Sequence, residues 1–353
     1  MKLPTDASLA LSQPTYFIAD IAANHDGSLQ RALDLIKLAA EAGADAAKFQ
    51  NFRAETIVSR RGFKELGKKL THQASWEKDV FDVYHDAALP IDWTEALIAE
   101  CGRNNIDYFT APYDMQYIDF FAPKMPYFKI GSGDITWKQS IERMASYGKP
   151  ILLATGASNL NEVEEAVSLI AKFRVPLILM QCNTNYTGRE DNFDYINLRA
   201  LETFKVKFPD IVLGLSDHSQ GYVAVLGAVA LGARAIEKHF TDDTSRIGPD
   251  HGFSLDPKMW KEMVDATRIL ERSLGDGIKR VEENEVEARI VQRRAFRYVS
   301  DFQEGHFILE TDLIALRPCP PDGLTPFEIE KIVGNRIKQN VEKDQLVRIV
   351  DLG

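Results

Sequence analysis

The sequence lacks several features that would place the protein in a specialised class. It has only three cysteines, Cys101, Cys182 and Cys319, and these are too few and too far apart for a disulfide framework or a zinc-binding spacing. No run of roughly 18 apolar residues occurs, and the amino terminus shows no basic start followed by a long apolar stretch. We therefore expect a reduced, cytoplasmic protein with no membrane contact, in which each cysteine is a small buried apolar residue.

Positive charge is also scarce. The chain has 42 lysines and arginines against 52 aspartates and glutamates, a net charge of -10. This balance argues against a nucleic-acid or anionic-membrane partner, and an anionic substrate would need a local group of lysines. The 45% hydrophobic and 27% charged residues are ordinary for a globular enzyme, and 353 residues suit a barrel of roughly 250 residues plus one small domain.

Short apolar segments alternate with helix-like segments along most of the chain. Strands are expected at residues 16–22, 45–50, 106–110, 127–130, 150–154, 177–182, 211–215 and 234–239. Eight strands in strict alternation with about eight helices predict a closed parallel barrel, the (β/α)8 or TIM barrel. No glycine-rich dinucleotide fingerprint follows the first strand, which disfavours an open doubly wound sheet.

Two stretches depart from this alternation. Residues 277–293 are rich in charge and are expected to link a barrel domain, 1–276, to a second domain, 294–353, of short strands and turns. The connection 53–92, after the second strand, is too long for a simple crossover. It carries Arg53, Arg60, Arg61, Lys64, Lys68 and Lys69. It is either a functional loop or lid, or a solvated charged face.

Two histidines stand at the ends of the last two expected strands. His218 follows 211–215, and His239 ends 234–239. Because parallel strands end at one edge of a barrel and side chains alternate along a strand, the pair Ser216 and His218 should face the pair Glu237 and His239. Polar groups aimed inward from neighbouring strands are costly unless something binds them. The pattern predicts a metal or substrate site.

The strand-end motifs, taken together, resemble those of the sialic acid synthase family. Members of that family join phosphoenolpyruvate (PEP) to an aldose and carry a small antifreeze-like (SAF) domain behind a TIM barrel. The resemblance covers nearly the whole chain. The motifs are IAANHDG (21–27), KFQ (48–50), FTAPYD (109–114), KIGSGD (129–134), LSDHS (215–219), EKHF (237–240), GPDHGFSLDP (248–257) and LRP (316–318).

The resemblance implies a role for each of these positions. Lys48 and Lys129 would hold the phosphate and carboxylate of PEP, which need fixed cations and hydrogen-bond donors. Asp20, Asp134 and Glu237 would complete the catalytic set. The substrate-binding set would be Gln50, Thr110, Ser132, Tyr186, Ser216, Asp250 and Arg317.

The resemblance also implies a cofactor and a partner. His218 and His239 would bind a divalent ion, manganese or magnesium in the family, although two imidazoles would also suit zinc. The expected reaction joins PEP to N-acetylmannosamine or a related N-acylated hexose, and its products are a nonulosonic acid and phosphate. Arg317 would reach into the barrel of a second copy in a domain-swapped homodimer.

The sequence departs from the family pattern at three positions. Asp20 and Asp134 stand where the family usually has glutamate, and Thr187 replaces a proline after the sixth strand. A misplacement of about 1 Å can cost roughly a hundredfold in rate, so either the second substrate differs or activity is reduced. Two other readings stay open. One is a metal-dependent hydrolase on the same barrel, and the other is a non-catalytic sugar-acid binding protein.

Overall fold

The computed structural model describes residues 2–68, 73–74 and 76–353. The chain divides into two compact units, residues 1–275 and 276–353. The stretch expected to be a linker, 277–293, falls in the second unit and contains the helix α13 (Val286–Gln292). Among the helices of the described ranges, none has the length and the apolar run that are needed to cross a membrane.

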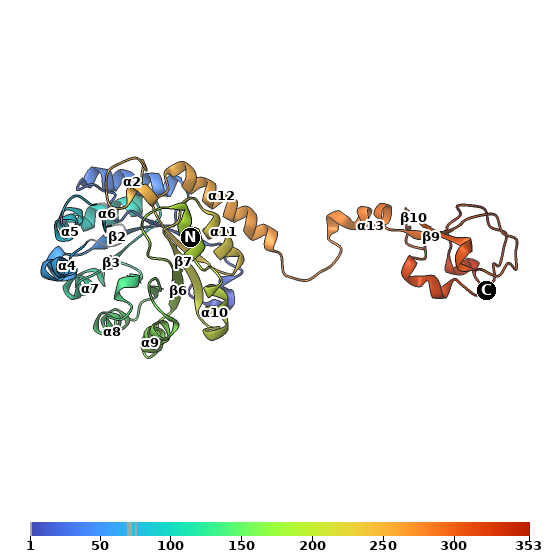
Figure 1. Cartoon of the computed structure of the whole chain (residues 1–353), viewed down its shortest axis with the longest axis horizontal. Helices are drawn as coiled ribbons and strands as arrows, with labels where there is room; N and C mark the ends of the chain where they lie inside the picture. The colour runs from blue at the N-terminus through green and yellow to red at the C-terminus, as the bar shows by residue number, and fades with distance from the viewer. Residues whose placement is uncertain (1, 69–72, 75) are drawn as a thin grey trace. The chain divides into compact units, whose positions relative to one another are not determined.

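The first unit is built on eight parallel strands, as the alternation predicts (Figure 1). Their hydrogen-bonded order is β3-β2-β1-β8-β7-β6-β5-β4. The two end strands of this order, β3 and β4, also contact each other, so the sheet curves into a barrel. The strands are β1 (Tyr16–Asp20), β2 (Ala46–Asn51), β3 (Asp107–Pro112), β4 (Phe128–Ile130), β5 (Ile151–Ala154), β6 (Leu177–Cys182), β7 (Val212–Asp217) and β8 (Ala235–His239).

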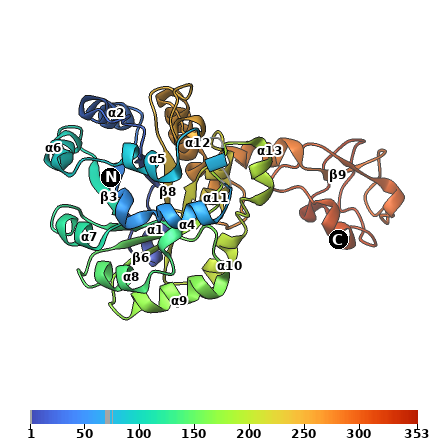
Figure 2. The ribbon, with the colours of Figure 1, turned by 60° about the vertical axis from the view of Figure 1, so that its left-hand side comes forward.

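One helix follows each strand and packs outside the barrel. Figure 2 shows α2 and α6 to α10 around the outside of the strands. The last helix of the barrel begins at Pro257, because Asp256 caps it by accepting from the Met259 N–H and Pro257 suits its first turn. The helices are α2 (Leu29–Glu41), α6 (Thr94–Arg103), α7 (Met115–Phe121), α8 (Lys138–Ala145), α9 (Leu160–Ala171), α10 (Ala200–Lys207), α11 (Val223–Ala230) and α12 (Pro257–Leu274).

Five further helices of the described ranges stand outside this scheme. The short α1 (Ala7–Ala10) precedes the first strand. The long connection after β2 holds α3 (Ala54–Ile57), α4 (Arg60–Glu65) and α5 (Val80–Ala87) before α6 begins. The fifth is α13 of the second unit. The long connection is therefore folded into helices rather than being a plain loop.

Strand register brings polar residues together at one end of the barrel. The strands are buried on both faces, which suits their runs of valine, isoleucine, leucine, phenylalanine and alanine. Polar side chains enter at the carboxyl ends. Asp20 of β1 pairs with Lys48 of β2 on one side and with His239 of β8 on the other, and Ser216 of β7 pairs with Glu237 of β8.

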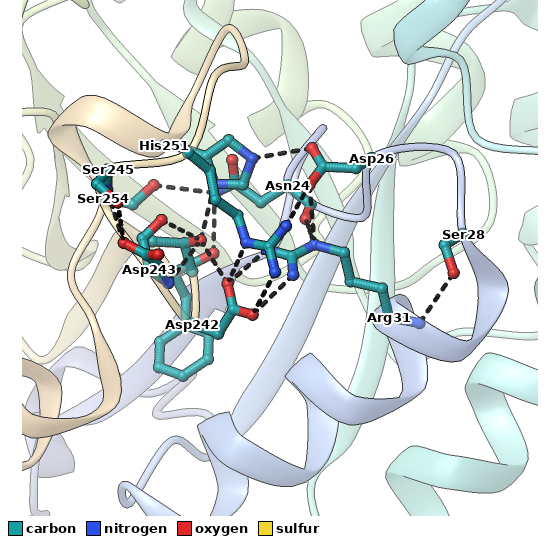
Figure 3. Close-up of polar contacts among 12 residues, drawn as sticks. Asn24, Asp26, Ser28, Arg31, Asp242, Asp243, Ser245, His251 and Ser254 are labelled. Atoms are coloured by element: carbon teal, nitrogen blue, oxygen red, sulfur yellow. Dashed lines mark hydrogen bonds and ion pairs between the residues drawn. The ribbon is translucent and has the colours of Figure 1, made fainter.

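A polar network, here called the brace, joins the loops that follow β1 and β8 (Figure 3). The brace consists of Asn24, Asp26, Arg31, Asp242 and His251. Arg31 donates to both carboxylate oxygens of Asp242, with Nη1 2.7 Å from Oδ2, and its Nε donates to the Asn24 carbonyl at 2.7 Å. His251 is fully buried, and its Nε2 lies 2.9 Å from Oδ1 of Asp26. The two loops are thus tied by charge-assisted bonds.

The brace also fixes the position of an acidic residue. Asn24 donates to the Phe240 carbonyl and to the Ser254 hydroxyl, both at 2.9 Å. Ser254 in turn donates to the carbonyl of Asp250 at 2.6 Å. The Asp250 side chain accepts from the Ala23 N–H at 3.1 Å. The loop after β8 therefore holds the Asp250 carboxylate against the loop after β1.

The second unit has a small core of its own. Two antiparallel strands, β9 (Ala295–Tyr298) and β10 (Leu313–Leu316), form its sheet. The remaining chain makes turns, short 3-10 helices and isolated bridges around them. The buried residues of this core are Phe296, Tyr298, Ile308, Leu324, Ile332, Ile337, Val341, Val347 and Leu352.

The close packing at Gly214 of β7 gives a stability prediction. A Cβ there would lie 2.8 Å from the Ala235 carbonyl oxygen of β8 and 3.0 Å from Cγ of Met180 on β6. Gly214→Ala should lower the free energy of unfolding by about 1–3 kcal/mol, because the strands that carry the polar cluster must shift. Gly102→Ala is the control, since a Cβ at this helical position meets nothing within 4 Å. Urea denaturation measures both, and an unchanged midpoint for Gly214→Ala would contradict the packing.

The brace gives a second prediction. Arg31→Met should speed amide hydrogen exchange in residues 21–28 and 241–256 by roughly tenfold or more, since hydrogen bonds to charged groups each contribute about 1.5–3 kcal/mol. Arg199→Met is the matched control, because the Arg199 side chain is 86% exposed and its one ion pair among the described residues is with Glu202. Exchange that rises equally in both variants, or in neither, would show that the two loops hold their positions without the brace.

Candidate active site

A pocket opens at the carboxyl ends of the barrel strands. Its volume of about 320 Å³ falls in the range of small-molecule sites. It collects side chains from strands β1, β2, β4, β7 and β8 and from the loops that follow them. The expected site residues that line it are Asp20, Lys48, Gln50, Lys129, Ser132, Asp134, Tyr186, Ser216, His218, Glu237, His239 and Asp250.

Two buried lysines and two buried carboxylates form the floor of this pocket. Nζ of Lys48 lies 2.7 Å from Oδ2 of Asp20 and 3.7 Å from Oε1 of Glu237, and Nζ of Lys129 lies 3.3 Å from the same Glu237 oxygen. Burial opposes the charge on Lys48, but Asp20 and Glu237 outweigh it and raise the pKa of the lysine above its usual value. The floor therefore keeps Lys48 cationic without exposing it to solvent.

Neutral side chains complete the hydrogen bonding of the floor. Gln50 donates to Oδ2 of Asp20 at 3.1 Å, and Ser216 donates to Oε1 of Glu237 at 3.1 Å. Oε2 of Glu237 is buried and has no hydrogen-bond partner among the described residues. An unpaired buried carboxylate oxygen is costly, which indicates that a bound group supplies its partner.

The two histidines meet as the strand pattern predicts. The imidazole rings of His218 and His239 lie 5.3 Å apart, and the Tyr186 ring packs 4.3 Å from that of His218. Burial, followed by the charges of His218 and Lys48, holds the pKa of His239 well below its usual value, so this ring is the neutral form that binds metals. Its Nδ1 is buried without a hydrogen-bond partner in the described part of the chain.

This histidine pair could bind a metal ion only if further ligands came from water or substrate. No group of three or more His, Cys, Asp or Glu side chains is arranged to hold a metal ion among the residues that the structure describes. Two imidazoles with an unpaired nitrogen can supply two ligands, so water and substrate oxygens would have to supply the others. That arrangement suits an open, catalytic site rather than a closed structural one.

Two further carboxylates have pKa values moved toward neutrality. Asp134 follows β4, and burial raises its pKa to about 6. Burial likewise raises the pKa of Asp250 to about 6, against the hydrogen bond from Ala23 that lowers it. Groups that titrate near the working pH can take up and return protons, as general acid–base chemistry requires. Asp20, although shorter than glutamate, still reaches Lys48 and Gln50.

Two expected site residues are not in the pocket lining. Thr110 of β3 is buried, and its hydroxyl donates to Oδ1 of Asn51 at 2.7 Å. Arg317 lies in the second unit, directly after β10, and is exposed. Ser132 does line the pocket, and its hydroxyl accepts from the Gly156 N–H at 2.9 Å.

The pocket includes residues that sequence reasoning did not single out. Val83, Tyr84 and Ala87 of α5 line it, together with Phe52 and Trp76. The sequence does contain a signal for the α5 residues, because residues 80, 83, 84 and 87 have the spacing of one apolar helix face. The residues of segment 53–92 that line the pocket are therefore apolar or aromatic ones, and not the arginines and lysines that drew attention to it.

The three arginines of the same segment make ion pairs instead, and Lys64 and Lys68 line a different pocket. Nε of Arg53 donates to Asp114 at 3.0 Å, and Arg60 pairs with Asp82 at 2.7 Å. Arg61 pairs with a glutamate one helical turn away. Lys69, which was also expected to belong to this charged group, lies outside the described residues.

All three cysteines are buried and free. Cys101 and Cys319 pack in the cores of the two units. Cys182, at the end of β6, has a further neighbour, because its Sγ lies 3.8 Å from Nδ1 of His218. Although burial alone would raise it, contact with His218 lowers the pKa of this thiol.

Comparisons with known proteins agree with this arrangement. Residues 35–279 match the model of the NeuB family. The chain is 33% identical over 338 residues to N,N'-diacetyllegionaminic acid synthase of Campylobacter jejuni, covering 95% of this chain and 99% of that protein. It is 29% identical to N-acetylneuraminate-9-phosphate synthase of Homo sapiens, covering 95% of this chain and 91% of that one.

A solved structure shows the same fold. The N-acetylneuraminic acid synthetase of Leptospira borgpetersenii serovar Hardjo-bovis, in complex with citrate, superimposes with a TM-score of 0.68 at 31% identity, over 78% of this chain and 90% of that one. The protein belongs to the NeuB family, whose named members include synthases of sialic and legionaminic acids.

Proposed function

We propose that the protein condenses phosphoenolpyruvate with an N-acylated aldose, N-acetylmannosamine or a related hexose, to give a nonulosonic acid and phosphate. The observation that carries this proposal is the floor of the pocket, where Lys48 and Lys129 stand buried beside the two histidines and share Glu237. Buried lysines at strand ends are costly and therefore serve the chemistry of an anion. The names of the relatives support the same reaction class.

The lysines account for the first substrate. PEP carries a carboxylate and a phosphate, and Lys48 and Lys129 are the two lysines that line the described pocket. Ser132 and Ser216, which also line it, would supply neutral hydrogen bonds to the same groups. In the structure the lysines are paired with Asp20 and Glu237, which hold them in place until the substrate anion arrives.

Besides PEP and the aldose, the reaction consumes only water. The methylene carbon of PEP bonds to the aldehyde carbon, whose oxygen takes up a proton. Water then adds to the carbon that bears the phosphate. The new hydroxyl loses its proton as phosphate departs with the electrons of the carbon–oxygen bond, and this leaves the ketone. Asp134 and Asp250, with pKa values of about 6, are placed to move these protons.

His218 and His239 would hold a divalent ion, manganese or magnesium, with the remaining positions left to water and substrate oxygens. Such an ion, when bound, polarises the aldehyde carbonyl toward attack. The residues of this chain do the rest. The Tyr186 and Phe253 rings pack around the imidazoles and exclude water from this side of the pocket.

The two alternative functions fit the site less well. A hydrolase needs a carboxylate ligand or base beside the histidines, but Glu237 is engaged by Lys48, Lys129 and Ser216. Asp20, whose Oδ2 lies 3.5 Å from Nε2 of His239, is engaged by Lys48 and Gln50 through the same oxygen. The lysines would have no role in such an enzyme. A non-catalytic binding protein is supported only by the two shortened carboxylates, and Asp20 keeps its contact with Lys48.

For the second unit we propose an antifreeze-like domain that acts in a domain-swapped homodimer. Arg317 is the residue proposed to contact substrate in the barrel of the second copy. It is exposed, and no ion pair involving it occurs among the described residues. A guanidinium that is not already engaged can bind a carboxylate or carbonyl elsewhere.

The proposed reaction is tested by phosphate release from PEP in the presence of N-acetylmannosamine. Release should stop in excess chelator and return with manganese or magnesium. His218→Ala and His239→Ala should each lower the rate by at least about 100-fold, because loss of a ligand costs no less than a misplacement of roughly 1 Å. His85→Ala on the outer surface of α5 is the control. Full turnover in chelator would exclude the metal, and no keto acid with any N-acylated hexose would exclude the synthase.

The domain swap is tested by mixing two inactive variants. A His239→Ala protein and an Arg317→Ala protein are dissociated together and allowed to reassociate. Random pairing makes half of the dimers mixed, and each mixed dimer has one site with both residues intact, so roughly a quarter of full activity should return. If Arg317 acts within its own chain, every site keeps one defect, and activity stays at the sum of the two variants.

A further inference from the structure

The inference concerns the part of the pocket formed by the chain that follows β2, and it rests on the proposed function. This side is formed by Phe52, Ile57, Trp76, Val83, Tyr84 and Ala87, here called the apolar wall, all of which line the pocket. Apart from Phe52, the wall comes from the long connection after β2.

Helix geometry explains why the wall is apolar. In α5, Val83, Tyr84 and Ala87 stand on the same face as the buried Val80, at spacings of three and four residues. The opposite face carries Asp82, which pairs with Arg60 at 2.7 Å. The helix therefore presents its apolar stripe to the substrate and its charged stripe to solvent.

Aromatic packing makes the wall continuous with the catalytic floor. The ring of Tyr84 lies 5.4 Å from that of Phe52 and 6.4 Å from that of Trp76. Phe52 in turn lies 6.4 Å from Tyr113, whose hydroxyl stands over Gly131 beside the floor. A molecule that extends from the floor toward α5 meets these ring faces and edges.

The charged side chains of the pocket limit which substituents a bound sugar can have. Among the described residues, the lining contains the carboxylates of Asp20, Asp134, Glu237 and Asp250 but only two lysines, and PEP uses both lysines through its own two anionic groups. The described cations of the long connection do not add to the lining. Arg53 is paired with Asp114, Arg60 with Asp82, Arg61 with Glu65 and Lys78 with Asp86, and Lys64 and Lys68 line a different pocket.

A second phosphate at the apolar wall would therefore meet carboxylates and aromatic rings rather than a described lysine or arginine side chain. Asp250 and Asp134 lie close enough to Tyr84 to raise the pKa of its hydroxyl further, beyond the larger effect of burial. Desolvating a phosphate without a partner costs several kcal/mol, whereas a methyl or N-acyl group gains about 25 cal/mol for each Å² that it buries.

The chemistry of the reaction identifies which end of the aldose reaches the wall. The aldehyde carbon reacts at the floor, so the end of the sugar chain farthest from it, carbon six, points away from the lysines. PEP supplies the first three carbons of the product, so carbon six of a hexose becomes carbon nine. A 9-phosphate product, as in the name of the human relative, would require a phosphate at this end.

We propose that the apolar wall binds the distal end of the aldose, and that the enzyme selects an uncharged aldose with apolar substituents there, a deoxy methyl or an N-acyl group, over a phosphorylated one. The wall thus decides specificity, while the floor performs the reaction. The product leaves the site without a phosphate at carbon nine.

A matched series of aldoses tests the proposal. N-acetylmannosamine, its 6-deoxy analogue and its 6-phosphate differ only at carbon six. Binding is measured by calorimetry with manganese present and PEP absent, and kcat/KM is measured from phosphate release with PEP present. The 6-deoxy sugar should exceed the 6-phosphate at least about tenfold in both measurements, a difference of about 1.4 kcal/mol.

A positive charge placed in the apolar wall should change the preference for the 6-deoxy sugar over the 6-phosphate. Val83→Lys brings an ammonium to the pocket side of α5 and should raise kcat/KM for the 6-phosphate by about tenfold while lowering it for the 6-deoxy sugar. His85→Lys adds the same charge on the exposed face of the same helix and should leave the order of the three sugars unchanged. The wild-type series decides the question by itself if the Val83 variant does not fold.

The outcomes separate this inference from the proposed function. Equal or tighter binding of the 6-phosphate to the wild-type protein overturns the inference, even if phosphate is released and the synthase activity stands. Preferential binding of the 6-deoxy sugar without any phosphate release upholds the wall and overturns the synthase. Binding of none of the three sugars overturns both.

Discussion

The site depends on the burial of charges that neutralise one another. Lys48 and Lys129 stand at strand ends where solvent is excluded. Lys48 is paired with Asp20 on the neighbouring strand β1, and Lys129 with Glu237 of β8, which is not a neighbour of β4 in the sheet. A lone buried ammonium would lose its proton, because desolvation disfavours the charged form. Asp20 and Glu237 counter this and raise the pKa of Lys48, in a protein whose net charge is -10.

The same pairing constrains the rest of the barrel. Salt bridges between strands hold only if the strand register is correct, and the register sets Asp20 beside both Lys48 and His239. The brace adds the next constraint, because it ties the loop after β8 to the loop after β1 and carries Asp250 to the pocket edge. Side chains from distant parts of the sequence are thus held by rigid elements, as precise chemistry requires.

Two different parts of the pocket carry out the reaction and select the substrate. Its floor is built by strand ends, whose positions the barrel fixes. Its apolar wall is built by the connection after β2, which can vary without disturbing the barrel. A family that makes different nine-carbon acids on one scaffold would be expected to vary this second part.

The sequence by itself determined the barrel and most of the floor. Eight apolar segments in alternation with helices predict the strands to within a few residues, and the period of two along each strand predicts that Ser216 faces Glu237 and that His218 meets His239. Local periodicity and the common direction of parallel strands are enough for these inferences, since both are properties of short segments.

Only the tertiary structure decided the wall, the brace and the contacts of Cys182 and Thr110. Trp76 and Tyr84 lie more than 20 residues from the end of any barrel strand, and their place depends on how the long connection folds back. Thr110 has the right residue type at a strand end, yet it bonds to Asn51 and not to the pocket. A sequence gives the spacing of residues along an element, whereas contacts between elements depend on how all of them pack, and no local pattern contains that information.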